Sequence, residues 1–221
     1  MDVSDKESIC NAVKVVEDTD GKLDILVNNA GVSGSTKAFI SDKSAPESAT
    51  IGDTLFSQST FDQWTKVFQT NTFAPFFVTT GFLSLLEKGA CSREGETSSV
   101  INISSCVGSM KISMTSFIYG VSKAGVDHLT TTMATEFALN KIPVRVNCIA
   151  PGAFPSQTTG TPEVLEKFIS RLPGAINPVP ALRAGREHEI GMAAVFLSSS
   201  AGEYTNGVIL RMDGGLALVN P

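Results

Sequence analysis

Four short apolar runs, each ending in glycine or small polar residues, constrain the fold more than any other feature of this chain. They lie at residues 23–27, 99–103, 144–149 and 208–212. Short, nearly continuous apolar runs are typical of parallel strands that are buried on both faces. The sequence therefore predicts an α/β fold with a doubly wound parallel sheet.

Polar motifs follow these runs at the points where the strands are expected to end. In chain order they are Asn28-Asn29-Ala30-Gly31, Ser104-Ser105, Ala150-Pro151-Gly152 and Asp213-Gly214-Gly215. Open α/β sheets bind their ligands outside the carboxyl ends of the strands. We therefore expect these motifs to share one edge of the sheet and to form a site there.

Tyr119 and Lys123 are separated by one helical turn in Tyr119-Gly120-Val121-Ser122-Lys123. This spacing places a phenol and an ammonium group on the same helix face. A nearby cation favours the phenolate and lowers the pKa of the phenol, which suits a general acid. The same spacing is also common on solvated helix faces, so the pair alone does not define a catalytic site.

Taken in this order, the motifs resemble the classical branch of the short-chain dehydrogenase/reductase family, and the resemblance extends from Asp2 to Asp213. It implies a three-layer Rossmann-type doubly wound parallel sheet in a single domain over residues 1–221. It also implies an NAD(P)(H)-dependent oxidoreductase that interconverts a carbonyl and a secondary alcohol of a small-molecule substrate by hydride transfer. NADPH is slightly preferred as the cofactor.

The family's catalytic tetrad corresponds here to Asn71, Ser105, Tyr119 and Lys123. By this resemblance Tyr119 is the general acid or base, and Lys123 lowers its pKa and holds the nicotinamide ribose. Ser105 bonds the reacting oxygen, with Ser104 as the adjacent alternative. Asn71 holds a water molecule that links Lys123 to solvent.

The resemblance also predicts the residues that bind the cofactor. Ser156 stands where the family most often has threonine, and either hydroxyl can bond the nicotinamide carboxamide. The predicted set is Asp2, Asn29, Ala30, Gly31, Tyr119, Lys123, Pro151, Gly152, Phe154 and Ser156.

A glycine-rich turn that would receive the cofactor pyrophosphate is absent from the sequence, although dinucleotide-binding folds normally begin with one. The resemblance therefore predicts an N-terminally incomplete domain that lacks the first βαβαβ portion. The family's strand order would then leave residues 23–27 at an edge of the sheet. The alternative function is a catalytically inactive fragment, or a mispredicted gene product, without the phosphate-binding half of the site.

Two segments beside the site are expected to lie at the surface. Residues 34–59 are rich in serine, threonine and small residues and predict an inserted surface loop. Residues 153–180 correspond to the family's substrate lid and include a short helix expected at 161–171. Phe154, Phe168 and Ile169 either line an apolar pocket there or pack the lid down. Between these segments, residues 60–86 predict a long helix bent at Pro75.

Composition limits the remaining classes of function. A chain of 221 residues with 42% hydrophobic residues can form one compact domain. A net charge of −5 without a basic stripe argues against nucleic-acid binding, and no apolar run is long enough to span a membrane. Four cysteines without paired spacing and two distant histidines predict no metal site. We expect a cytoplasmic protein, and the resemblance implies a homodimer or homotetramer with His128 at the surface or interface.

Overall fold

The computed structural model describes residues 1–34, 50–114, 116–156, 159–170 and 176–221, and within them it contains a four-stranded parallel sheet. The strand order is β1-β2-β3-β4, with Leu26 opposite Val100 and Val100 opposite Val146. The strands are β1 (Ile25–Asn28), β2 (Ser98–Ile103), β3 (Val144–Pro151) and β4 (Ile209–Met212). All four predicted strands are confirmed, and β1 forms an edge of the described sheet.

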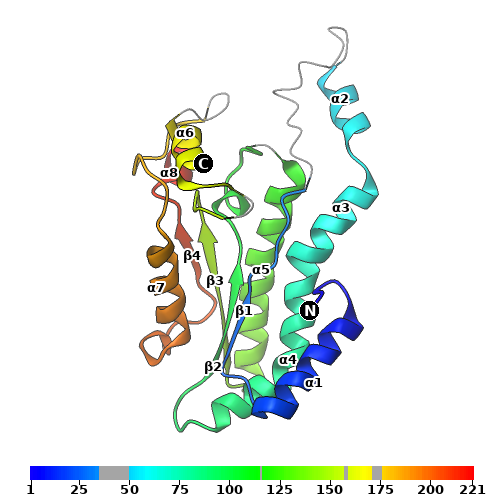
Figure 1. Cartoon of the computed structure of the whole chain (residues 1–221), viewed down its shortest axis with the longest axis vertical. Coiled ribbons are helices and arrows are strands. Elements are labelled where there is room, and N and C mark those ends of the chain that lie inside the picture. Colours follow the sequence, from blue (N-terminus) through cyan, green and yellow to red (C-terminus); the bar gives the residue numbers. More distant parts are fainter. Residues whose placement is uncertain (35–49, 115, 157–158, 171–175) are drawn as a thin grey trace.

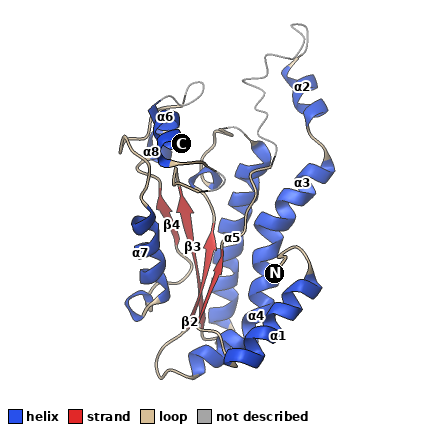
Figure 2. Ribbon diagram, in the orientation of Figure 1, coloured by secondary structure: helices blue, strands red, loops and turns tan. Residues whose placement is uncertain are grey.

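Helices cover both faces of this sheet, so the predicted three-layer architecture is confirmed (Figures 1 and 2). One face carries α1 (Lys6–Asp20), α4 (Ala74–Cys91) and α5 (Phe117–Leu139), and the other carries α7 (Glu187–Ser198). The main apolar core lies between the sheet and the helices α1, α4 and α5. A smaller core lies between the sheet and α7. The remaining elements are α2 (Ile51–Gln58), α3 (Phe61–Phe68), η1 (Gln69–Phe73), η2 (Cys106–Gly108), α6 (Pro162–Ser170), η3 (Ser200–Gly202) and α8 (Leu216–Val219).

The single bent helix predicted for residues 60–86 consists of three segments. Thr60 begins α3 with a capping box to Gln63, a π-helical stretch follows as η1, and α4 extends beyond the predicted end. Pro75 lies in the first turn of α4 and has no N–H to donate to the carbonyl four residues earlier. Asn71 therefore lies within a π-helical stretch, a local irregularity that is frequent at functional sites.

The prediction of a surface loop at residues 34–59 is wrong for its last part, which is helical. Residues 35–49 lie outside the described part of the chain, but Ile51–Gln58 forms the helix α2. Thr50 caps α2 and exchanges bonds with Asp53 in a capping box, a local signal that stabilises a helix start. The helix extends away from the sheet (Figure 1).

The lid region contains the expected short helix, α6, at Pro162–Ser170. Ile169 is only 3% exposed and packs in a small core with Cys106, Val179 and Leu216. Its burial favours the interpretation that this residue packs the lid down. The side chain of Phe168 lies outside the described residues. In the described part of the chain, no helix combines the length and apolar character needed to cross a membrane.

Candidate active site

The four predicted catalytic residues come from three elements at the carboxyl end of the sheet. Ser105 follows β2 and precedes η2, Asn71 lies in η1, and Tyr119 and Lys123 lie in the first two turns of α5. Ser116 caps α5, because its hydroxyl accepts a bond from the Tyr119 amide at 3.3 Å. The start of α5, and with it the position of Tyr119, is thus fixed locally.

Lys123 is a buried cation beside Tyr119. Lys123 is only 4% exposed, and its Nζ lies 5.7 Å from the centroid of the Tyr119 ring. The ammonium donates a hydrogen bond of 2.8 Å to the carbonyl oxygen of Ile103. This bond holds the Lys123 ammonium against the end of β2. The positive charge is shielded there from bulk water.

The pKa values of this pair reflect burial. Burial raises the pKa of Tyr119 above its usual range, and a hydrogen bond with Ser105 opposes the increase. Burial lowers the pKa of Lys123 to about 8, and electrostatic interactions with Cys148 and Asp127 oppose the decrease. The predicted lowering of the Tyr119 pKa by Lys123 is therefore not seen here. Tyr119 is a protonated phenol at neutral pH, as proton donation requires.

Asn71 connects the π-helical stretch to two other parts of the site. Its Oδ1 accepts a bond from the Val32 amide at 2.8 Å, and its Nδ2 donates to the Val32 carbonyl at 2.9 Å. The same Nδ2 also donates to the Ser122 hydroxyl at 3.0 Å. The side chain thus fixes the loop after β1 against α5.

The two adjacent serines after β2 have different partners. The Ser104 hydroxyl donates to the Lys123 carbonyl at 3.1 Å and is 3% exposed. The Ser105 hydroxyl donates to the Pro151 carbonyl at 3.4 Å, and Ser105 is close enough to Tyr119 to lower the pKa of its phenol. This arrangement gives Ser104 a role in holding α5 and places Ser105 near Tyr119.

Gly31 leaves open space beside Asn71 and Lys123, three residues after the end of β1. A methyl group built on Gly31 would lie 3.5 Å from both Asn71 Oδ1 and Lys123 Nζ. The missing side chain therefore leaves a cradle bordered by an amide and a cation. Asn29 and Ala30 precede it and are exposed. These residues fit a nicotinamide cofactor, because Lys123 and Tyr119 offer polar atoms toward ribose hydroxyls.

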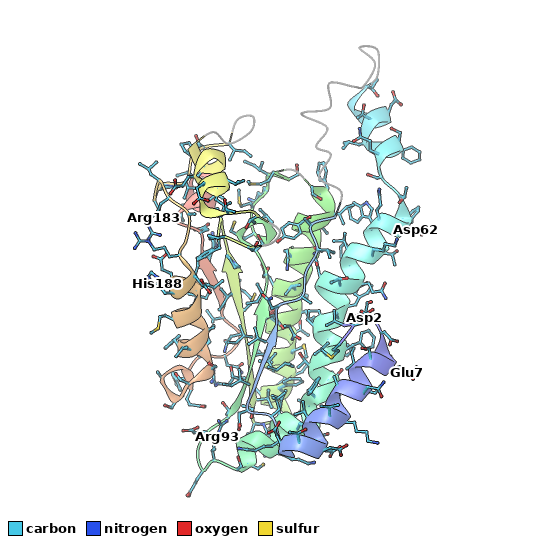
Figure 3. All side chains as sticks on the ribbon, in the orientation of Figure 1. Asp2, Glu7, Asp62, Arg93, Arg183 and His188 are labelled. Carbon is cyan, nitrogen blue, oxygen red and sulfur yellow. The ribbon has the colours of Figure 1, made fainter. Side chains whose placement is uncertain are left out.

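Asp2, the expected adenine contact, lies just before α1 with an exposed carboxylate (Figure 3). Its oxygen accepts bonds from the Ser4 amide at 2.8 Å and the Ser4 hydroxyl at 2.7 Å, which lower its pKa. Neighbouring residues Met1 and Val3 line a cavity of about 150 Å³ together with Asn29 and Ala30. The cavity connects this segment with the loop after β1.

The residues after β3 are held by the end of β4. The Gly152 amide donates to the Met212 carbonyl at 2.9 Å, and a methyl group on Gly152 would lie 2.7 Å from the Asp213 Cα. Only glycine permits this approach without a shift of the backbone. Pro151 and Phe154 are partly buried, and Ser156 is exposed with its hydroxyl 2.8 Å from that of Thr159.

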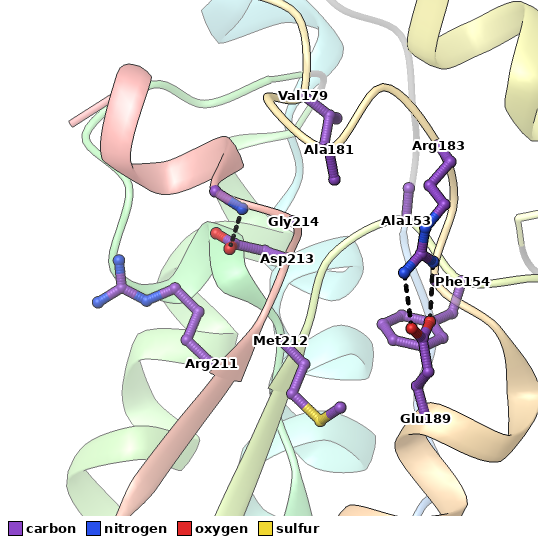
Figure 4. A pocket seen from close by; sticks show the side chains of 12 residues that line it. Ala153, Phe154, Val179, Ala181, Arg183, Glu189, Arg211, Met212, Asp213 and Gly214 are labelled. Atoms are coloured by element: carbon purple, nitrogen blue, oxygen red, sulfur yellow. Dashed lines mark hydrogen bonds and ion pairs between the residues drawn. The ribbon is translucent and has the colours of Figure 1, made fainter.

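A cavity of about 350 Å³ opens beside Phe154, between the lid and the ends of β3 and β4. Arg183 and Glu189 form a bidentate ion pair at its wall, with bonds of 2.7 and 2.9 Å (Figure 4). The lining residues are Ala153, Phe154, Val179, Ala181, Arg183, Gly185, Glu189, Arg211, Met212, Asp213, Gly214 and Gly215. Among the described residues, no group of three or more histidine, cysteine, aspartate or glutamate side chains could hold a metal ion.

Ser122 is a site residue that the sequence analysis did not identify. It is fully buried, and its hydroxyl accepts from Asn71 and donates to the Tyr119 carbonyl at 2.8 Å. The only feature of the sequence that pointed to Ser122 was its position next to Lys123. Asn71 and Lys123 bond backbone groups of Val32 and Ile103, so the side chains of these two partners give no indication of the contacts.

The chain is similar in sequence to known proteins over nearly its whole length. The family model described as enoyl-(acyl carrier protein) reductase matches residues 1–217. The chain is 36% identical to the short-chain dehydrogenase/reductase VdtF of Byssochlamys spectabilis, over 91% of this chain and 70% of that protein. It is 31% identical to the rhamnolipids biosynthesis 3-oxoacyl-[acyl-carrier-protein] reductase of Pseudomonas aeruginosa, over 98% and 75% of the two chains.

A solved structure is similar over nearly the whole chain. The Pseudomonas aeruginosa RhlG/NADP active-site complex has a TM-score of 0.77 and 30% identity, covering 98% of this chain and 75% of that one. With a family model that matches almost every residue and relatives above 30% identity, this chain belongs to the short-chain dehydrogenase/reductase family.

Proposed function

We propose that this chain is an NAD(P)(H)-dependent oxidoreductase that reduces a carbonyl to a secondary alcohol and catalyses the reverse reaction, with Tyr119 as the general acid or base. The observation that carries this proposal is the convergence of four side chains from distant segments. Ser105 lies close enough to Tyr119 to affect the pKa of its phenol, Tyr119 lies beside Lys123, and Lys123 and Asn71 border the space at Gly31.

Each residue has a defined task in the proposed reaction. A bound nicotinamide cofactor supplies or accepts the hydride. Tyr119, protonated at neutral pH because burial raises its pKa, donates its phenolic proton to the carbonyl oxygen during reduction. The Ser105 hydroxyl donates a hydrogen bond to the same oxygen and stabilises its developing negative charge. Lys123 binds the ribose hydroxyls and places a positive charge beside Tyr119.

Asn71 would supply the path by which Tyr119 recovers its proton. Because its side chain is engaged by Val32 and Ser122, we assign the water contact to the backbone carbonyl of Asn71. Pro75, four residues further on, has no N–H to donate to that carbonyl. A water bound there would link the buried Lys123 to solvent.

The named relatives support a ketone as the group that is reduced. Two relatives from Pseudomonas aeruginosa and Vibrio harveyi are named 3-oxoacyl-[acyl-carrier-protein] reductases. The solved complex with NADP supports a slight preference for NADPH. The other cofactor contacts would come from Asp2, Asn29, Ala30, Gly31, Pro151, Gly152, Phe154 and Ser156.

A fluorescence titration with NADH and, separately, NADPH tests the first step. Saturable micromolar binding supports the proposal, and no binding up to millimolar cofactor contradicts it. With a ketone substrate, Tyr119→Phe should reduce turnover by about 10² to 10⁴ while much of the cofactor affinity remains. Tyr204→Phe is the matched control, because the chain has two tyrosines and Tyr204 is fully exposed.

The exposed apolar edge of the sheet favours a second candidate function. In this alternative the chain is catalytically inactive and is stabilised by association with a partner. Ile25 and Val27 of β1 are 43% and 47% exposed, which is a hazard for aggregation. Under this candidate the titration shows no binding, and the purified chain binds a hydrophobic dye or elutes as large aggregates.

We also propose a cytoplasmic homodimer or homotetramer that is formed through α4 and α5. Phe73, Phe76, Phe77 and Val121 expose between 40% and 49% of their surface on these helices and the adjoining η1. A groove of about 460 Å³ runs between them and is lined by Thr72, Phe73, Phe76, Phe77, Gly125, His128, Leu129 and Thr132. Sedimentation should show a dimer or tetramer for the native chain and a monomer for Phe77→Glu.

A further inference from the structure

A continuous chain of side-chain hydrogen bonds begins at the end of β1 and is not used by the proposed reaction. The Asn28 amide nitrogen donates to Asn102 Oδ1 on β2 at 2.8 Å, and the Asn102 amide nitrogen donates to the Thr130 hydroxyl on α5 at 2.9 Å. The Thr130 hydroxyl donates in turn to the Val126 carbonyl at 2.8 Å. A branch runs from the Asn28 amide nitrogen to the Thr79 hydroxyl on α4 at 3.0 Å. We call Asn28, Thr79, Asn102 and Thr130 the asparagine–threonine network.

This network replaces apolar packing at one level of the main core. Asn28 and Asn102 lie opposite each other in the register of β1 and β2. Two residues earlier, and thus on the same face of the sheet, Leu26 and Val100 pack in the apolar core. The network residues on β2, α4 and α5 are each 0% exposed, where a polar atom without a partner is costly. In the described part of the chain, no buried polar side-chain atom of the network lacks a partner.

The loop after β1 is fastened to α5 at both of its ends. At its start, the asparagine–threonine network connects Asn28 with α5. At its end, Val32 exchanges two bonds with Asn71, whose Nδ2 also donates to a hydroxyl on α5. Gly31 lies between these two anchors, and a methyl group built on it would lie 3.5 Å from Lys123 Nζ on the same helix. The two anchors therefore set the distance between the loop and the helix that carries the site.

We propose that Asn102 and Thr130 are positioning residues that hold the start of this loop against α5 and thereby keep the space at Gly31 open. Both residues act through the backbone, because their hydrogen bonds lead to Asn28 rather than into the space itself. A fully paired buried network favours a single arrangement of the segments it joins. The effect on a cofactor rests on the function proposed above, whereas the effect on the loop does not.

Exchange of the Val32 amide with deuterium, followed by NMR, tests this role in the free chain. The amide donates to Asn71 Oδ1 at 2.8 Å, so its exchange reports how often the loop opens. Thr130→Val keeps the shape of the side chain and leaves the Asn102 amide without its acceptor. The variant should therefore exchange the Val32 amide about fivefold faster than the native chain. Thr130→Ser keeps the hydroxyl and should restore a rate within about twofold of the native one.

A matched control separates positioning from a general loss of stability. Ser99 is a buried residue of β2 whose hydroxyl donates to the Leu197 carbonyl of α7, on the other face of the sheet, at 3.0 Å. Ser99→Ala should leave the Val32 exchange rate within about twofold of the native value. If Thr130→Val does not fold, Thr130→Ala makes the same prediction. A native Val32 rate in the folded Thr130 variant, or an equal acceleration in Ser99→Ala, overturns the proposal.

Cofactor affinity gives a second readout, at a residue two hydrogen bonds away from the loop. If the native chain binds NADPH, Thr130→Val should weaken this binding about fivefold and Thr130→Ser should restore it. Faster Val32 exchange with unchanged NADPH affinity overturns the proposal, because the loop would then move without effect on the space at Gly31.

The two readouts distinguish this proposal from the proposed function. Faster Val32 exchange in Thr130→Val, when the native chain binds no nicotinamide cofactor, supports the positioning role and contradicts the reductase function. Unchanged exchange, when the native chain binds NADPH, contradicts the positioning role and leaves the reductase function supported.

Discussion

β1 and β3 belong to one sheet and have similar apolar sequences, but their surroundings are opposite. In β3 every residue from Val144 to Ala150 is buried, whereas β1 alternates between exposed and partly buried residues. β3 pairs with β2 and β4 and contacts α5 and α7 on its two faces, whereas β1 pairs only with β2 among the described strands. Position in the sheet, rather than strand composition, therefore decides how much each strand contributes to stability.

The largest expected effect compares the same substitution in the two strands. Ile149 is fully buried and Ile25 is 43% exposed. Ile149→Ala should lower the free energy of unfolding by about 2 to 5 kcal/mol through lost burial and a residual cavity. Ile25→Ala should cost less than about 1 kcal/mol. Urea denaturation measures both values, and equal losses would mean that β1 is covered in solution.

The glycines that follow the two strands extend the comparison to the site. Gly152 has no room for a side chain, because an added methyl would lie 2.7 Å from the Asp213 Cα. Gly152→Ala should therefore destabilise the chain by about 1 to 3 kcal/mol. Gly31→Ala should change stability by no more than about 0.5 kcal/mol, because its neighbours lie at 3.5 Å.

Gly31→Ala should act on binding instead. Its methyl would occupy the space between Asn71 Oδ1 and Lys123 Nζ, where the cofactor is proposed to lie. Calorimetry with NADPH and urea denaturation of both alanine variants distinguish the two effects. A Gly31→Ala chain with native cofactor affinity would exclude that space from the binding site.

The sequence predicted the features that repeat a local pattern. Apolar runs located all four strands, and the polar residues after them located Ser105, Gly31 and Gly152 at the carboxyl edge of the sheet. The spacing of Tyr119 and Lys123 placed both on one face of α5. These features follow from the periodicity of strands and helices, which short segments already contain.

Contacts between distant segments were not predictable in the same way. Asn71 bonds the backbone of Val32, and Lys123 bonds the backbone of Ile103, so neither partner is identified by its side chain. The raised pKa of Tyr119 depends on burial, which only the assembled fold provides. The helix α2 was missed although Thr50 and Asp53 form a capping box, because the small polar residues around it suggested a loop.

A charge at the exposed edge should change association more than stability. Val27 is 47% exposed on β1, where an unpaired strand edge can bind another chain. Val27→Lys should reduce light scattering and hydrophobic-dye binding, with a stability change of about 0.5 kcal/mol or less. Val15→Lys is the control, because Val15 is 63% exposed but lies on the helix α1. Equal reductions in both variants would assign the effect to net charge.

The smallest expected effect concerns a charge pair far from the centre of the sheet. Arg183 and Glu189 form a bidentate pair with side chains 45% and 30% exposed, and hydrogen bonds from Arg183 lower the pKa of Glu189 to about 2. Because the folded pKa lies below the usual 4.5, the stabilisation is complete above pH 4.5 and is lost as the pH falls toward 2. Solvent screening keeps this contribution small compared with that of Ile149.

Urea midpoints measured between pH 7 and pH 2 test this dependence. The native chain should be slightly more stable than Glu189→Gln at pH 7, and the difference should vanish near pH 2, where Glu189 becomes protonated in the folded chain. Glu187→Gln, in the same first turn of α7, controls for the effect of a charge near the helix start. A difference that persists at pH 2, or one equally large for Glu187→Gln, would show that the pair with Arg183 does not stabilise the segment between the lid and α7. The contrast between β1 and β3 would then extend to polar contacts, because only those in buried surroundings would contribute measurably to stability.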